Sequence, residues 1–90
     1  MAFELLVEAI PDVTREVIVV RCVDGTVRIG DFITGARSIG GATTEAILEV
    51  DLIELYDGVF VDELEFAHVG RVSIRGPIPP AVAPGWRLIG

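Results

Sequence analysis

The sequence contains no lysine, asparagine or glutamine, and only one cysteine and one histidine. The single cysteine, Cys22, excludes an internal disulfide and a cysteine-rich zinc site. Because Cys22 lies within an apolar run, we expect a buried, unreactive thiol. His68 is the single candidate general base, and the scattered carboxylates show no metal-ligand spacing around it. We therefore expect a non-enzymatic protein without a cofactor or a metal.

Long hydrophobic runs are also missing. No apolar stretch reaches the length of about 18 residues that is typical of a membrane-spanning helix. The segment 1–8 carries two acidic residues and no positive charge, unlike the start of a secretory signal peptide. These absences favour a cytoplasmic protein without membrane contact.

Positive charge is scarce and comes from arginine alone. Seven arginines stand against 14 acidic residues, which gives a formal net charge of −7 at pH 7. A net negative domain repels nucleic-acid phosphates at long range, and it attracts basic surfaces. Charge therefore favours a protein partner, in particular a basic one, and disfavours RNA or a ribosome.

Hydrophobic residues, by contrast, make up 51% of the 90 residues, and charged residues only 23%. Such a composition is far from that of disordered chains. A length of 90 residues fits one domain, since domains span about 50–250 residues. We expect a single folded domain over residues 1–90.

Alternation of apolar and polar residues predicts the secondary structure. Segments with this two-residue period, or rich in β-branched residues, are expected to form strands: Phe3–Ala9, Val17–Val23, Phe32–Thr34, Thr44–Tyr56, Val69–Arg75 and Trp86–Ile89. No segment predicts a convincing helix. Five or six strands with short turns therefore predict an all-β protein, a small closed six-stranded antiparallel-type barrel.

Glycine and proline predict the connections between these strands. Asp24-Gly25 and Asp57-Gly58 mark turns. We expect Gly35–Ala42, with three glycines, to be the most mobile loop, and Val59–Glu65 to be an irregular connection. Four prolines make Gly76–Pro84 a wide turn.

The same reading assigns side chains to the barrel interior. Leu48, Val50 and Leu52 alternate on one face of their predicted strand, so we expect all three to share an environment. We also expect Val27 and Ile29 to fill the barrel interior.

Three stretches resemble motifs of other chemistry but lack an essential part. Gly25–Gly30 has the glycine spacing of a phosphate-binding loop without its lysine, so we expect no nucleotide binding. Ala36–Gly40 is one residue short of a nucleophile elbow, which needs a larger α/β sheet. The acidic cluster Asp62, Glu63 and Glu65 is typical of a solvated surface.

Three parts of the chain together carry a family resemblance. The order and spacing of the following stretches are similar to those of one family: Val17–Asp31, then Ile53–Tyr56 with Val61–Glu63 and His68–Gly70, then Ile74–Gly76 with Pro84–Leu88. The family is that of domain 2 of translational GTPases, the elongation factor Tu domain 2-like β-barrel. The resemblance implies a stand-alone copy of this barrel, because these residues contain no counterpart of the GTP-binding domain.

The resemblance also implies candidate binding residues. In elongation factor Tu this domain holds the 3′ end of charged tRNA, and in relatives it touches ribosomal RNA. Glu54 and Tyr56 match the acidic and aromatic residues around the terminal adenosine. Asp57, however, replaces an arginine near the terminal phosphate, and His68 replaces an asparagine that faces the aminoacyl group. An acid beside a phosphate is repulsive.

Two functions remain open at this point. The first is a non-catalytic protein-binding module, regulatory or immunity-like, that uses an acidic surface and the glycine-rich loop. The alternative is a translation-associated domain that binds RNA, the ribosome or a tRNA 3′ end through Arg21, Arg71 and Arg75. Arginines gathered on one face would favour RNA, and a uniformly negative surface would favour a protein.

Overall fold

Strands account for all the regular secondary structure in residues 2–11 and 14–90, which are the residues that the computed structural model describes. No helix occurs in these residues. The strands are, in chain order, β1 (Glu4–Ala9), β2 (Val17–Asp24), β3 (Val27–Arg28), β4 (Phe32–Arg37), β5 (Thr43–Tyr56), β6 (Val59–Val61), β7 (Glu63–Leu64), β8 (Val69–Arg75) and β9 (Arg87–Ile89). The prediction of an all-β protein is confirmed.

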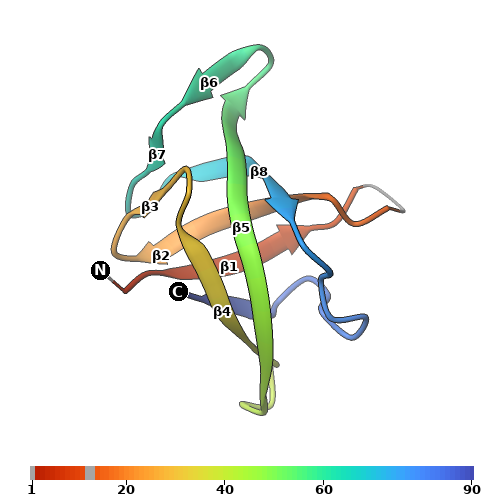
Figure 1. Ribbon diagram of the computed structural model, residues 1–90. Helices are drawn as coiled ribbons and strands as arrows, with labels where there is room; N and C mark the ends of the chain where they lie inside the picture. Colours follow the sequence, from red (N-terminus) through yellow and green to blue (C-terminus); the bar gives the residue numbers. More distant parts are fainter. Residues whose placement is uncertain (1, 12–13) are drawn as a thin grey trace.

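Six of these strands close into an antiparallel barrel (Figure 1). The order is β4-β9-β1-β2-β8-β5, and β4 also pairs with β5, which joins the two ends of the sheet. The predicted closed six-stranded barrel is therefore confirmed. One further strand, β6, pairs with β5 alone, and β3 pairs with β7 in a separate two-stranded sheet.

The barrel interior holds a continuous apolar core. It follows the predicted alternation, with fully or almost fully buried side chains on the inner face of each long strand: Leu5, Val7, Ile18, Val20, Cys22, Leu48, Val50, Ile53, Val72 and Leu88. Cys22 is buried, as predicted. Val27 of β3 and Leu64 of β7 are opposite each other in their ladder and complete this core.

The proline-rich segment Gly76–Pro84 forms a wide turn between β8 and β9, as predicted. It buries Ile78 and Val82 against the core. Arg15 holds the segment in place by donating Nη2 hydrogen bonds to the carbonyl oxygens of Pro79 at 3.2 Å and of Val82 at 2.6 Å.

An ion-pair cluster lies where the barrel closes. Glu4 of β1 accepts hydrogen bonds from Arg37 of β4, at 2.9 Å, and from Arg87 of β9. The two arginines are directly opposite each other in the β4–β9 ladder. The single negative charge of Glu4 therefore offsets part of the repulsion between two like charges that the closure brings together.

The predicted loop Gly35–Ala42 is wrong at its start. Strand β4 continues to Arg37, and the turn is confined to Ser38–Ala42, closed by a hydrogen bond from Ser38 N to Ala42 O of 2.8 Å. The reason is that Gly35 pairs with both Glu45 of β5 and Ile89 of β9. The glycine is part of the seam of the barrel rather than of a loop.

Two predicted interior positions are also wrong. Leu52 is 44% exposed, because a β-bulge between Val50 and Leu52 shifts the alternation and turns Ile53 inward instead. Ile29 is also exposed, since it follows the end of β3 and only Val27 reaches the core.

The segment Val59–Glu65, predicted as irregular, contains β6 and β7. These strands have only three and two residues, so their alternation is too short to detect in the sequence. Within the described ranges, the structure contains no helix with the length and hydropathy needed to span a membrane.

Candidate functional site

A β-hairpin projects beyond the barrel (Figure 1). Strand β5 has 14 residues and continues past its pairing with β8 into the predicted Asp57-Gly58 turn, from which β6 runs back. Gly58 has a φ of 76°, and Glu54 Oε2 accepts a hydrogen bond of 2.9 Å from Gly58 N. We call residues 54–61 the β5–β6 arm. Glu54 thus stabilises the turn of the arm.

The surface at the base of the arm is hollowed. Two adjoining depressions, of about 530 and 270 Å³, share the side chains of Leu55 and His68. Their other lining residues come from five strands and the segments next to them: Arg28, Tyr56, Val61, Asp62, Glu63, Glu65 and Val69. We call this surface the arm hollow. It includes Tyr56 and His68, two of the predicted site residues.

Two backbone features position the part of the arm hollow formed by β7, β8 and His68. Gly70 has no side chain, and a Cβ there would lie 3.2 Å from Leu64 Cδ1, so the glycine allows β7 to pack closely over β8. Ala67 has a φ of 71° and donates a hydrogen bond to Cys22 O. This turn fixes the backbone next to His68.

The arm hollow is negatively charged. It contains the carboxylates of Asp62, Glu63 and Glu65 against a single arginine, Arg28, whose Nη2 lies 3.3 Å from Glu63 Oε2. Among the described residues, no cation pairs with Asp62, Glu65 or the nearby Asp57. These three carboxylates are therefore exposed without compensation.

Exposed aromatic side chains accompany this charge. Tyr56 is 68% exposed, Phe60 of β6 is 59% exposed, and Phe66 is 65% exposed. All three come from the arm or from the turn that follows β7. Of the three, Tyr56 lines the arm hollow. Large apolar groups that remain in water are typical of binding surfaces.

The three predicted arginines do not line the arm hollow. Arg21 pairs with Glu8 at 3.3 Å and donates to Ala67 O, and Arg75 pairs with Asp51 at 3.0 Å. Arg71 is exposed and is opposite Glu54 in the β5–β8 ladder, without an ion pair among the described residues. Arg21 and Arg75 are thus already engaged by acids of this chain.

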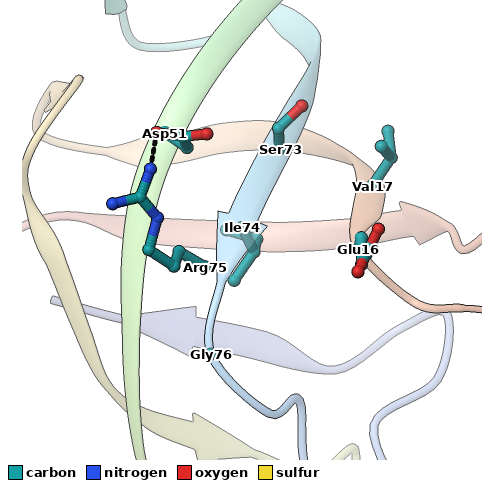
Figure 2. A pocket seen from close by; sticks show the side chains of 7 residues that line it. All are labelled: Glu16, Val17, Asp51, Ser73, Ile74, Arg75 and Gly76. Carbon is teal, nitrogen blue, oxygen red and sulfur yellow. Dashed lines mark hydrogen bonds and ion pairs between the residues drawn. The ribbon is translucent and has the colours of Figure 1, made fainter.

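A second depression, of about 370 Å³, lies against β8 (Figure 2). Its polar side chains are Glu16, Asp51, Ser73 and Arg75, and Figure 2 shows the Asp51–Arg75 ion pair at its edge. Ser73 has no histidine beside it here, since His68 lines the arm hollow instead. The depression therefore does not combine a serine with an imidazole base.

No group of three or more histidine, cysteine or acidic side chains is arranged to hold a metal ion in the part of the chain that the structure describes. Burial raises the pKa of the Cys22 thiol, which keeps it protonated and poorly nucleophilic. The described residues around the two depressions thus present surface charge and exposed aromatic groups.

Sequence reasoning missed several residues of the arm hollow. Arg28, Leu55 and Val61 were not candidates, because their proximity depends on the short β3–β7 and β5–β6 pairs. The one available signal is the acidic run after Val61, a pattern that is also typical of a solvated surface.

Comparison with known proteins adds no relative. A scan against protein-family models finds no match, and a search of curated proteins finds none either. The fold, a closed six-stranded antiparallel barrel with one added strand, is therefore established by the strand pairing alone.

Proposed function

We propose that this protein is a non-catalytic binding module that recognises another protein through the arm hollow. We further propose that its barrel is of the elongation factor Tu domain 2 type, on the motifs in Val17–Asp31 and His68–Gly70. The observation that carries the functional proposal is the combination, in the lining of one hollow, of the uncompensated acids Asp62 and Glu65 with the exposed aromatic ring of Tyr56.

This combination suits a protein interface. Aromatic side chains are enriched at interfaces, and they supply large contact area with little loss of conformational freedom. The exposed carboxylates favour a partner with basic residues, because complementary charge speeds association and rejects acidic competitors. A domain of this kind would act by covering a basic surface, as a regulatory or immunity factor does.

RNA binding is the alternative, and one observation favours it. Tyr56 and His68 line the same hollow. Tyr56 matches the aromatic residue near the tRNA terminal adenosine in the family that the sequence resembles, and His68 stands where that family has an asparagine. Charge opposes this alternative. Two like charges about 4 Å apart repel by about 1 kcal/mol in water, and by more where solvent is excluded. Asp57 would place such a charge near a ligand phosphate.

Affinity capture from native lysate, with and without RNase, tests the proposal. The informative variant is Asp62→Asn with Glu65→Gln, which removes two exposed charges from the arm hollow. The matched control is Glu16→Gln with Glu45→Gln. It removes two exposed acids that lie outside the hollow.

We expect the wild type and the control to retain the same proteins after RNase treatment, and the hollow variant to lose them. Capture that RNase abolishes, or that the hollow variant leaves unchanged, would contradict the proposal. The first of these results would favour the RNA alternative.

A further inference from the structure

Apart from the two-residue strands β3 and β7, which pair with each other alone, the described strands leave one sheet edge open, that of β6. Each of the six barrel strands has a neighbour on both sides, because β4 pairs with both β5 and β9. Strand β6 pairs with β5 only, through Ile53↔Val61, Glu54↔Phe60 and Tyr56↔Val59. One side of β6 therefore presents backbone groups that no described strand satisfies, on the hairpin that projects beyond the barrel (Figure 1).

The side chains of this edge are suited to a further strand. Val59, Phe60 and Val61 are β-branched or aromatic, the types that stabilise sheets through pairs across neighbouring strands. Phe60 is largely exposed and is not covered by a described element. A strand added beside β6 would cover part of this aromatic surface.

Charge decides which strand the edge accepts. Asp62 directly follows β6 and Asp57 precedes it by two residues, and neither pairs with a cation of the described residues. A second copy of this chain would bring the same acids and a net charge of −7, so edge-to-edge pairing of two copies is disfavoured. A basic segment would instead be attracted to both ends of β6.

We propose that β6 binds an extended, basic segment of a partner protein by β-strand addition, with main-chain hydrogen bonds to β6 and arginine or lysine side chains near Asp57 and Asp62. In this binding mode the backbone supplies affinity and the alternate side chains supply specificity. The inference rests on the proposed protein-binding function and specifies its partner: an extended basic peptide rather than a folded basic surface.

A fluorescence anisotropy titration tests this mode with a defined probe. The probe is a labelled short peptide of alternating arginine and valine, compared with the same sequence N-methylated at every residue. Both peptides carry the same charge, but only the first can donate main-chain hydrogen bonds. We expect the methylated peptide to bind at least about tenfold more weakly.

Protein variants locate the binding. Asp62→Lys should weaken binding of the unmethylated peptide by about threefold or more. Glu45→Lys, the same kind of charge reversal at an exposed acid outside the arm, should reduce its affinity less. Bound peptide should also slow amide hydrogen exchange in the segment Val59–Val61. That protection separates strand addition from a diffuse electrostatic contact.

Equal binding of the two peptides, no saturable binding of either, or unchanged exchange at β6 would overturn the inference. Self-association of the chain in sedimentation equilibrium that slows exchange at β6 would overturn it as well, in favour of a second copy. These results would overturn the strand-addition inference only, because the proposed function is tested separately by affinity capture. If Asp62→Asn with Glu65→Gln leaves capture unchanged, the proposed function fails instead.

Discussion

Replacing Glu4 by glutamine tests how the barrel is closed. Glu4 is the shared acceptor for Arg37 and Arg87, and its side chain is only 21% exposed. Glutamine keeps the size of the side chain but removes the negative charge between two arginines that are opposite each other. The closure should therefore become less stable.

The expected magnitude follows from the two lost interactions. A hydrogen bond to a charged group contributes about 1.5–3 kcal/mol. Because both arginines are partly exposed and solvent screens the pairs, we expect a total loss of about 1–2 kcal/mol for Glu4→Gln. In a domain of this size that corresponds to a decrease in Tm of about 5–15 °C.

The pH dependence gives this prediction a specific sign. The hydrogen bond from Arg87 holds the pKa of Glu4 below its ordinary value, and the charge of Arg37 acts in the same direction against the opposing effect of burial. A carboxyl with a lowered pKa in the folded state stabilises the protein fully above its ordinary pKa. That stabilisation is lost as the pH falls through the lowered value.

Urea unfolding of the wild type and Glu4→Gln, from neutral pH down to about pH 3, measures both effects. The difference in unfolding free energy should be largest near neutral pH and should shrink at acidic pH. The exposed Glu45→Gln is the control and should change stability by less than about 0.5 kcal/mol. A difference that does not depend on pH, or a variant as stable as the wild type, would refute the reasoning.

Three further predictions concern stability and reactivity. Arg15→Met should lower the unfolding free energy by about 1–3 kcal/mol, because it removes the arginine donor to Val82 O and one of the two donors to Pro79 O; an effect no larger than that of exposed Arg75→Met would contradict this. Gly25→Ala should lower the stability measured by thermal unfolding by about 1–2 kcal/mol or more. Gly25 has a φ of 69°, and a Cβ there would collide with the carbonyl oxygen of Ala2. An unchanged Tm would contradict this, because it would show that the turn adapts. Cys22 should react with iodoacetamide only after denaturation, because burial raises its pKa; rapid labelling of the folded protein, followed by mass spectrometry, would count against this.

The long strands were predictable from the sequence because each buries one face and exposes the other. Alternation in Phe3–Ala9 and Val69–Arg75 is a direct record of that environment, and the structure contains β1 and β8 there. Leu52 was misplaced because a bulge interrupts the alternation, and no residue type marks a bulge. Gly35 was misplaced because glycine occurs both in loops and in strands that pack closely against a neighbouring backbone.

The candidate site was predictable in part. Tyr56 and His68 were found through the family resemblance, and the structure places both in the arm hollow. Arg28 joins them only through the β3–β7 pair, which is too short to leave a periodic signal. The engagement of Arg21 and Arg75 by acids on other strands also depends on the three-dimensional register.

Charge reversal at the tip of the arm tests the central claim, that this surface binds protein rather than RNA, most directly. The measurement is fluorescence anisotropy at physiological salt with the wild type and Asp57→Arg. Two labelled ligands are used: an aminoacylated acceptor-stem mimic of tRNA, and the alternating arginine–valine peptide. We predict weak RNA binding by the wild type, and opposite responses to the substitution, with tighter RNA binding and weaker peptide binding. Sub-micromolar RNA binding by the wild type, or RNA and peptide affinities that Asp57→Arg leaves unchanged, would contradict the account.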